Sequence, residues 1–318
     1  MVPPASSRPF ERGRRSAGSS VAARVSAVAV AVLLVAYLAV SFNYAERLSR
    51  VERSEIERAA SYVAASHEDV TFETADGLTL RGWWFPAEKA RDRAAVLVHG
   101  KDQNRIDSTF NAGRIAGTLL SRGYSVLLFD VRGHGESEGL RWGLGEKEAF
   151  DVAAAVDLAA EKAGIPRSRV ALVAESMGAG SALMALAHVP DVGPVVTDSA
   201  YADGSTVVGE IAPAVSGLPD WFTPGMVLMA KLFFAIDLAA VRPVDQVKAL
   251  PDKAFLFIHC QEDSTVFVHH AHDLRAASAS PRSELWIAPD CGHVRAYSRH
   301  PAEWEARVLA FLERELGE

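Results

Sequence analysis

The chain has 318 residues, of which 49% are hydrophobic and 23% charged, and its formal net charge is −7. This composition is typical of a folded globular protein and excludes a largely disordered chain. The acidic balance argues against nucleic acid as the main partner, because a surface that follows phosphates needs clustered lysine and arginine. The two cysteines are not spaced as CxxC, which excludes a zinc finger or zinc ribbon.

The N-terminal part of the chain has the composition of a membrane anchor. Residues 1–24 form a basic segment with five arginines and one glutamate. An uncharged apolar run follows over residues 25–42, which is about the minimum length that crosses the hydrocarbon core of a bilayer. The run has no polar stripe, unlike an amphipathic core helix. We therefore predict one transmembrane helix over residues 25–43.

A basic start followed by an apolar stretch also describes a secretory signal peptide. This stretch is longer than the usual signal, and no clean A-x-A cleavage site follows it, which favours an uncleaved signal-anchor. Arginines are nearly as dense after the stretch as before it, so the positive-inside rule discriminates only mildly. We expect the N-terminus inside, and the bulk of the chain outside the cytoplasm, tethered to the cell membrane.

Residues 44–68 place apolar side chains at helical spacing among arginines and glutamates, which predicts a charged helical linker that lifts the next domain off the bilayer. Residues 69–318 then alternate strands and helices. A hairpin is expected at 69–85. Later strands are expected at 94–100, 125–130, 169–174, 194–198, 254–260 and 284–289, with helices near 109–122, 146–163, 178–188, 267–278 and 301–315. Short apolar strands between helices predict an α/β fold with a mostly parallel, eight-stranded sheet covered on both faces.

In such sheets, chemistry gathers at the carboxyl ends of the strands. Ser176 lies between a buried strand and a helix start, which is the position of a nucleophile on a sharp turn. Ala174, Gly178 and Gly180 are the small neighbours that such a turn needs. The helix N-terminus behind Ser176 places N–H groups and a positive dipole end where an oxyanion would form.

A literal search for G-x-S-x-G selects Ser137 instead. That serine lies beyond the end of its strand, is not followed by a helix start, and has a glutamate on each side that would repel a developing oxyanion. We interpret residues 132–135, including His134, as a structural loop whose glycines permit tight turns.

A nucleophilic serine needs a base and a group that orients the base. His293 follows the strand 284–289 on a loop at the same sheet edge, so it is the candidate base. Two other histidines at strand ends, His99 and His259, are interpreted as buried structural residues. Three histidines at a helix start are interpreted as solvated surface residues: His269, His270 and His272.

Asp263 is the candidate orienting acid, because it follows the strand 254–260, the strand next before that of His293. Asp198 at the end of the strand 194–198 is the alternative, and Glu262 is expected to point to solvent. The resulting chain order of serine, acid and histidine is that of one particular fold.

With these residues placed, residues 69–316 resemble the α/β-hydrolase superfamily. Within it they look like membrane-anchored bacterial hydrolases of the Bem46-like kind, which overlap with the serine aminopeptidase-like group. Five motifs carry the resemblance in chain order: His99-Gly100, the segment 130–137, the Ser176 elbow, the Asp263 loop and Gly292-His293. The resemblance implies that the backbone N–H groups of Lys101 and Met177 form an oxyanion hole. The chain departs from the family pattern at Ala174, where the elbow usually has glycine.

A serine at the elbow fits acyl transfer to water through an acyl-enzyme, and disfavours dehalogenase or epoxide hydrolase chemistry, which use aspartate there. We therefore predict a serine hydrolase that cleaves esters or thioesters, with no metal or organic cofactor implied. A peptidase, and a non-catalytic membrane-anchored binding protein that kept the fold, stay open as alternatives.

Residues 201–251 form an apolar insertion interrupted by prolines. Either these side chains pack onto the sheet, or they form a cap whose methionines and phenylalanines bind the acyl chain of a small or amphiphilic, lipid-like ester.

The cysteines leave a second question open. Cys260 and Cys291 each closely precede a candidate residue, so an oxidised pair would fix the acid and base loops together, whereas two buried free thiols are the simpler interpretation.

Overall fold

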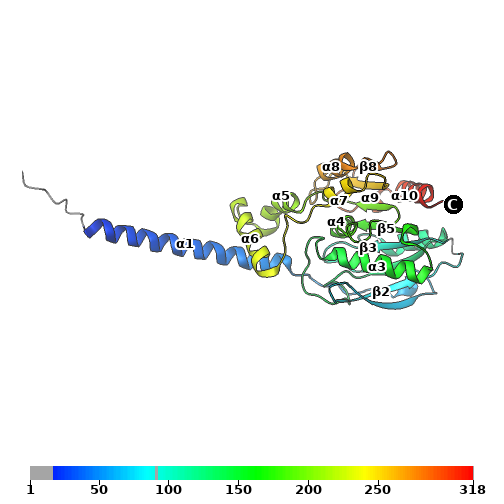
Figure 1. The fold of residues 1–318 in the computed structure, drawn as a ribbon, viewed down its shortest axis with the longest axis horizontal. Coiled ribbons are helices and arrows are strands. Elements are labelled where there is room, and N and C mark those ends of the chain that lie inside the picture. The colour runs from blue at the N-terminus through cyan, green and yellow to red at the C-terminus, as the bar shows by residue number, and fades with distance from the viewer. Residues whose placement is uncertain (1–16, 90–91, 318) are drawn as a thin grey trace, which may run out of the picture.

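The computed structural model describes residues 17–89 and 92–317, and one long helix projects from its α/β body (Figure 1). This helix, α1 (Ala17–Ser49), is longer than the predicted span of residues 25–43 because no glycine or proline interrupts it after Gly18. Among the described residues it is the one helix long and apolar enough to cross a membrane, over Val21–Ser49. The predicted basic segment lies outside the described residues up to position 16.

The predicted helical linker is wrong beyond α1, because residues 50–59 contain no helix and only a short 3-10 turn, η1 (Ala60–Tyr62), follows. The cause is a set of contacts with the globular body. The Arg53 guanidinium donates hydrogen bonds of 2.7–3.3 Å to four main-chain carbonyls in the loop 134–139. Ile56 and Val63 pack against the buried core. The segment is therefore fastened to the domain and does not hold it at a distance.

The predicted eight-stranded sheet is confirmed. Its strands are β1 (Glu68–Glu73), β2 (Thr79–Phe85), β3 (Ala94–Val98), β4 (Ser125–Phe129), β5 (Val170–Glu175), β6 (Val195–Asp198), β7 (Phe255–Cys260) and β8 (Glu284–Ala288). They lie in the order β1-β2-β4-β3-β5-β6-β7-β8. The hairpin strand β1 pairs antiparallel with β2, and β2 pairs antiparallel with β4, whereas all pairs from β4 to β8 are parallel.

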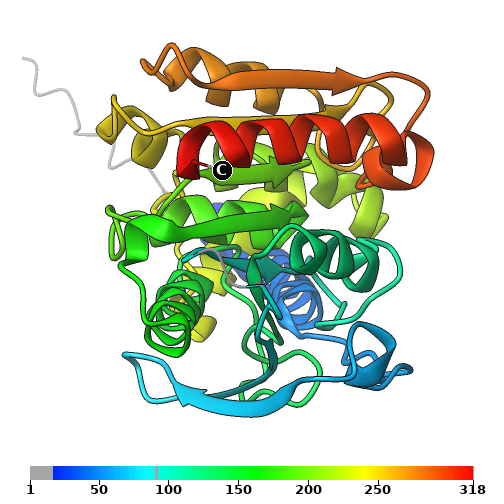
Figure 2. The ribbon, with the colours of Figure 1, turned by 90° about the vertical axis from the view of Figure 1, so that its right-hand side faces the viewer.

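Helices cover both faces of this sheet. One face carries α3 (Glu148–Ala163), α4 (Ser176–Ala185), α7 (Pro243–Ala249) and α8 (His269–Ala277); the other carries α2 (Ala112–Ser121), α9 (Ala296–Arg299) and α10 (Pro301–Leu316). Successive residues of a strand point to opposite faces, so Val96 and Val98 enter the first core, and Ala95 and Leu97 the second. Figure 2 shows α10 (red) lying alongside the strands that it covers.

Part of the insertion 201–251 packs onto the sheet and part forms a cap, so each predicted arrangement is found in one part of it. Its last helix, α7, packs onto the sheet through Val247. Its first part, α5 (Gly204–Ser216), η3 (Asp220–Phe222) and α6 (Thr223–Phe234), forms a cap that stands away from the sheet, and α6 lies beside α1 (Figure 1). The contact between the cap and α1 was not expected from either arrangement.

The structure also decides between the two states of the cysteines. Cys260, the last residue of β7, and Cys291, in the loop after β8, form a disulfide. The two free thiols of the simpler interpretation are therefore not found. The bond joins the loops that carry Asp263 and His293.

Candidate active site

Ser176 stands on the sharp turn between β5 and α4, with a φ of +49°. A positive φ is unusual for a residue with a side chain and marks a strained turn. The two glycines that follow are required by close packing. A Cβ at Gly178 would collide with the carbonyl oxygens of Val98 and His99, and one at Gly180 would collide with the ring of Tyr201. Gly178 thus lets α4 approach the end of β3 closely, and Gly180 leaves room for Tyr201.

The structure brings three of the predicted site residues together at one edge of the sheet. Ser176 Oγ lies 2.8 Å from His293 Nε2, and His293 Nδ1 lies 2.8 Å from Asp263 Oδ2. Their loops follow β5, β8 and β7; β7 and β8 are adjacent in the sheet, and β6 separates β7 from β5. The Asp263 side chain is fully buried, whereas His293 is 21% exposed and so stays open to a substrate.

The environment of Asp263 keeps its carboxylate charged. Its Oδ1 accepts hydrogen bonds of 2.9 Å from the N–H groups of Thr265 and Val266. Burial by itself would raise the pKa of Asp263, but contacts with His259 and His293 hold this pKa well below its usual range. A charged Asp263 binds the Nδ1–H of His293, which leaves Nε2 free to accept a proton from Ser176.

Asp198, the alternative acid, has a different partner. Its carboxylate accepts a hydrogen bond of 3.1 Å from Ser199 Oγ, and Ser199 Oγ in turn accepts one of 3.2 Å from the N–H of Val294. Burial raises the pKa of Asp198 to about 6, against the opposing effects of His259 and His293. Asp198 therefore supports the loop that carries His293 and does not orient its ring. Glu262 is exposed, as predicted.

A cleft of about 250 Å³ opens beside these residues. Lys101 and Met177, the two predicted oxyanion-hole residues, line it together with Ser176 and His293. Met177 is the second residue of α4, where an N–H group has no partner within the helix. The apolar wall comes from Val207 and Ile211 of α5 and from Trp142.

The predicted acyl-binding surface of methionine and phenylalanine is not part of this cleft. Met226 of α6 instead lines a separate cavity against α1, and Phe233 and Phe234 contact Phe42 of α1. The reason is that α6 packs on α1, so that α5 is the cap helix that reaches the cleft.

Comparisons with known proteins agree with this fold. The model of the family described as serine aminopeptidase, S33, matches residues 89–234, and that of the prolyl oligopeptidase family matches residues 230–318. A solved structure of the esterase Pf2001 from Pyrococcus furiosus superposes with a TM-score of 0.69 and 26% identity, over 84% of this chain and 99% of that one. The chain belongs to the α/β-hydrolase superfamily.

Curated relatives of this α/β-hydrolase include two uncharacterised bacterial proteins. It is 24% identical over 277 residues to the uncharacterised protein YfhR of Salmonella typhi, covering 80% of this chain and 84% of the relative. It is 27% identical over 221 residues to the uncharacterised protein YqkD of Bacillus subtilis, covering 69% and 70% respectively. The serine hydrolase families and the esterase structure together identify the protein as a hydrolase of the α/β type.

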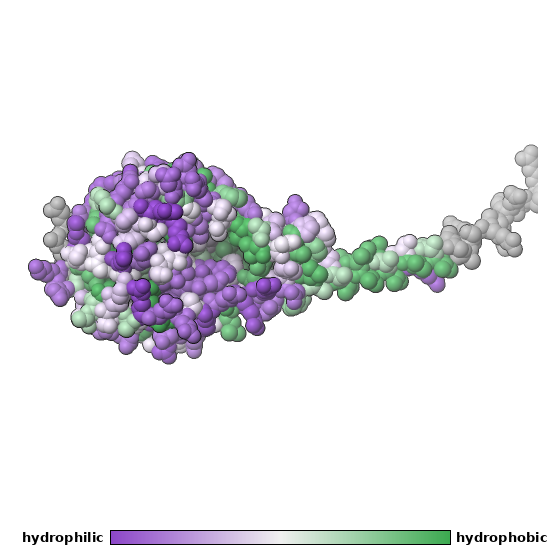
Figure 3. Space-filling view, turned by 180° about the vertical axis from the view of Figure 1, so that it is seen from behind, coloured by the Kyte–Doolittle hydropathy of each residue, from purple (hydrophilic) through white to green (hydrophobic). Residues whose placement is uncertain are grey.

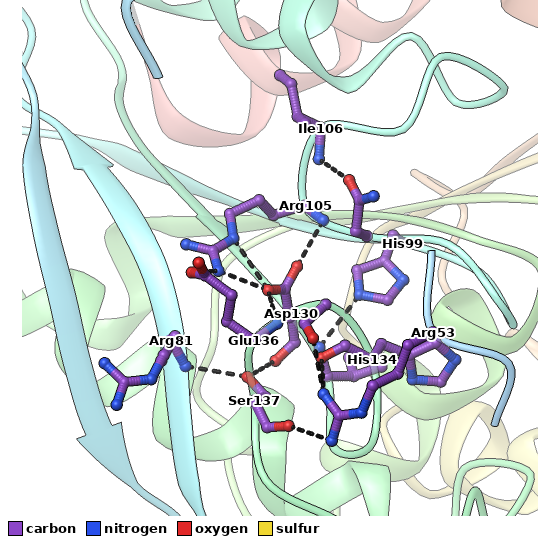
Figure 4. A network of polar contacts seen from close by, with 12 residues as sticks. Arg53, Arg81, His99, Arg105, Ile106, Asp130, His134, Glu136 and Ser137 are labelled. Atoms are coloured by element: carbon purple, nitrogen blue, oxygen red, sulfur yellow. Dashed lines mark hydrogen bonds and ion pairs between the residues drawn. The ribbon is translucent and has the colours of Figure 1, made fainter. Parts of the chain in front are cut away.

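Two buried histidines of this α/β-hydrolase, His99 and His134, hold the loop that carries Lys101. Figure 4 shows both rings. His99 donates through Nδ1 to the carbonyl of Gly100 at 2.8 Å, and its Nε2 accepts from the N–H of Val131. His134 accepts a hydrogen bond of 2.9 Å from the N–H of Asp102 through Nε2. Burial lowers the pKa of both, that of His134 to about 3, so both rings are neutral. Sequence reasoning identified them as structural but not as supports of the predicted oxyanion loop.

Glu175 is a further support that sequence reasoning missed. The N–H of Gly100 donates to Glu175 Oε1 at 3.2 Å and to Gln103 Oε1 at 3.0 Å. Burial, with the nearby charge of Asp198, raises the pKa of Glu175 well above its usual value. An acid directly before the elbow serine was the available signal, because that position ends a fully buried strand.

Ser137, the serine of the literal motif, is a structural residue (Figure 4). Its Oγ donates a hydrogen bond of 2.6 Å to the carbonyl of Asp130 and accepts one of 2.9 Å from the N–H of Arg81. The Asp130 carboxylate is held by the buried Arg105 guanidinium at 2.6 Å. Ser137 thus closes a loop around a buried ion pair, and no base lies against its hydroxyl among the described residues.

One group of side chains in the described part of the chain lies close enough to hold a metal ion: Glu210, His269 and His270. The N–H of Ala202 donates to His270 Nδ1 at 3.2 Å, so Nε2 carries a proton and donates to Glu210 at 3.1 Å. His269 lies 2.7 Å from the other oxygen of Glu210. The group therefore fastens α5 of the cap to α8. His270 is buried by these contacts, so its interpretation as solvated surface was wrong.

Proposed function

We propose that this α/β-hydrolase is a serine hydrolase that cleaves carboxylic esters or thioesters through an acyl-enzyme on Ser176. The observation that carries the proposal is the hydrogen-bonded series from Ser176 through His293 to Asp263 beside a cleft with an apolar wall. The similarity to a solved esterase at 26% identity supports an ester over other acyl substrates.

The geometry supports the following steps. His293 Nε2 takes the proton of Ser176 Oγ, and the serine oxygen attacks the carbonyl carbon of the ester. The N–H groups of Lys101 and Met177 stabilise the resulting oxyanion. His293 then returns its proton to the leaving alcohol or thiol, which gives the acyl-enzyme. A water molecule repeats the two steps, releases the acid and regenerates Ser176. Asp263 keeps its negative charge and stabilises the imidazolium ion.

A fluorophosphonate probe tests the nucleophile directly, because it modifies only an activated serine. We expect the full chain and Ser137→Ala to be labelled, and Ser176→Ala to be unlabelled. Labelling that survives in Ser176→Ala would refute the assigned nucleophile. A folded wild-type protein that is not labelled would favour the alternative of a membrane-anchored binding protein.

A peptidase is the second candidate, because both matching family models are named after peptidases. The two activities are separated by comparing p-nitrophenyl esters with aminoacyl p-nitroanilides on the same preparation. We expect kcat/KM to be larger for the esters. A larger value for the anilides, lost in Ser176→Ala, would assign the chain to the peptidases.

We further propose that α1 is retained as a single-pass membrane anchor and that the catalytic domain is extracytoplasmic. The same apolar helix also fits a cleaved signal sequence. Two observations support an anchor: α1 packs along α6, and Arg141 of the domain donates to the carbonyl of Glu46. The disulfide fits an oxidising compartment. Protease added to intact spheroplasts should digest the domain, and the mass of the protein purified from membranes should include α1. Protection of the domain from the protease would mean that the domain lies on the cytoplasmic side.

A further inference from the structure

The cap presents exposed apolar side chains beside the proposed anchor. Trp221 in η3 is 58% exposed, and Leu232 and Phe233 in α6 are 64% and 61% exposed. Leu228 and Val215 add to this surface. Single exposed apolar residues are normal in soluble proteins, but a contiguous group marks an interaction surface. Figure 3 shows the apolar surface of α1 continuing onto the adjoining part of the globular body.

The cap lies at a defined level along α1. Tyr37 stacks on Phe222 with ring centroids 5.1 Å apart, and its hydroxyl donates to the carbonyl of Trp221 at 3.1 Å. Five residues further along α1, the ring of Phe42 packs edge-on against Phe233 at 5.1 Å. Gly225 lies between these contacts, where a Cβ would collide with Tyr37 and with Ser41 of α1. Residues 221–233 therefore run along α1 from Tyr37 toward the domain.

The rise per residue of an α-helix gives the depth at which Tyr37 would lie in a bilayer. A hydrocarbon core of about 30 Å needs about 20 helical residues at about 1.5 Å each. Counted from Val25, which follows Arg24, such a span ends near Tyr44, so Tyr37 lies about 10 Å inside the boundary. A count from Val21 moves the boundary by about 6 Å and leaves Tyr37 near it. Tyrosine and tryptophan are enriched at the membrane–water interface, which agrees with the count from Val21.

We propose that residues 221–233 are a membrane-docking element that lies in the bilayer interface beside α1, and that the substrate is a lipid-borne ester that reaches Ser176 from the bilayer. The docking surface follows from the exposed side chains and their level along α1. The second part rests on the proposed function. Lipid is the favoured occupant over a second copy of the chain because the surface continues the exposed apolar face of α1.

Two separate apolar spaces lie between this surface and Ser176, one on each side of α5. A cavity of about 70 Å³ lies between α1, α5 and α6, and Val208 and Ala212 of α5 line it. The neighbouring residues Val207 and Ile211 line the cleft of Ser176, on the other side of the same helix. Trp142 lines both spaces, and its Nε1–H donates to the carbonyl of Leu48 at 2.9 Å, near the end of α1. We infer that an acyl chain from beside α1 reaches the cleft at Trp142, the residue that separates the two spaces.

The docking surface is tested in liposomes without reference to activity. Leu232→Cys in the full chain is labelled with an environment-sensitive NBD fluorophore without reductant, because the native cysteines are joined in a disulfide. The protein is reconstituted in phosphatidylcholine vesicles with and without doxyl-labelled lipid. The control is Ala310→Cys on α10, which lies at the opposite end of the domain from α1 (Figure 1).

We expect doxyl lipid to quench the Leu232→Cys label several-fold more than the Ala310→Cys label. Equal quenching at the two positions would overturn the proposal. A blue-shifted Leu232→Cys label that doxyl lipid does not quench, and that responds to the ratio of protein to lipid, would also overturn it, because a second copy of the chain would then cover the surface.

The lipid substrate is tested with the double variant Leu232→Asp and Phe233→Asp. We compare hydrolysis of soluble p-nitrophenyl butyrate with that of a long-chain p-nitrophenyl ester placed in the same vesicles. We expect the vesicle ester to be cleaved at least about tenfold more slowly by the variant, because two exposed apolar side chains that we place in the bilayer become charged, while the soluble ester is cleaved within about twofold of wild type.

The outcomes separate the two proposals. An equal loss on both esters, or no loss on either, would overturn the entry of substrate from the bilayer. A wild-type protein that cleaves neither ester would refute the proposed function and with it the lipid substrate, whereas the quenching result would still decide the docking surface.

Discussion

The carboxylate of Asp263 holds the imidazole of His293 through a hydrogen bond of 2.8 Å from Nδ1 to Oδ2. The other oxygen of Asp263 is held by the N–H groups of Thr265 and Val266, so the carboxylate cannot rotate away. This bond fixes the tautomer of His293 and therefore the atom that faces Ser176.

Replacing Asp263 by asparagine is expected to lower kcat for ester hydrolysis by about 10³–10⁴-fold, because an amide no longer stabilises the imidazolium ion and permits the wrong tautomer. Steady-state kinetics on a soluble p-nitrophenyl ester measures the effect, with Asp198→Asn as the matched control. Asp198 contacts Ser199, so its variant should retain activity within a few-fold. A larger loss of kcat in Asp198→Asn than in Asp263→Asn would mean that Asp198, and not Asp263, orients His293.

Loss of the disulfide should destabilise the domain. Cys260 and Cys291 are separated by 31 residues, and closing a loop of that size stabilises the folded state by about 3–4 kcal/mol in the chain-entropy model. We expect reductant, or the double variant Cys260→Ala and Cys291→Ala, to lower the urea midpoint of unfolding. The double variant should not respond to reductant, which makes it the control. An unchanged midpoint in reduced wild-type protein would contradict the bond's stabilising role.

The close approach of α4 to β3 depends on Gly178. In Gly178→Ala the added Cβ overlaps the carbonyl oxygens of Val98 and His99, so α4 must move away from the strand that leads into the Lys101 loop. We expect a loss of about 1–3 kcal/mol in the free energy of unfolding, as for other overpacked sites, and a lower kcat for ester hydrolysis.

Gly117→Ala in α2 is the matched control for this substitution, because no atom lies within 4 Å of its added Cβ. That variant should be stabilised by up to about 1 kcal/mol, since alanine favours the helix. Thermal unfolding of the two variants measures the difference. Equal shifts in Tm would mean that the contact between α4 and β3 can relax.

The buried histidine His134 should make the domain sensitive to acid. Burial first, and His99 second, lower the folded-state pKa of His134 from 6.5 to about 3. The unfolded chain therefore binds the proton more readily than the folded one. The free energy of unfolding is highest, as far as His134 is concerned, above pH 6.5, and it decreases as the pH falls toward about 3. The loss amounts to a few kcal/mol.

Urea unfolding at pH 7 and pH 4.5 measures this effect. His134→Gln removes the titrating group, and its amide offers both a donor and an acceptor at the site. We expect its stability to fall less between the two pH values than that of wild type. Parallel decreases in the two proteins would show that other groups, such as His99, cause the acid sensitivity.

The order of the elements and the positions of the strand ends could be predicted from local patterns along the chain. Alternating apolar strands and amphipathic helices are local patterns, and the carboxyl ends of parallel strands must meet at one edge. For that reason Ser176, Asp263 and His293 could be selected before any contact was known. The sharp turn at Ser176 was likewise readable from its small neighbours.

The contacts between distant groups could be known only from the folded molecule. Residues 50–59 have helical spacing, but four hydrogen bonds from Arg53 to a distant loop hold them outside a helix. The choice of Asp263 over Asp198 depends on which carboxylate reaches Nδ1 of His293, and the disulfide depends on the approach of two loops. The packing of α6 on α1 joins segments more than 180 residues apart. Local periodicity carries no information about such contacts, because they form only when the whole chain has folded.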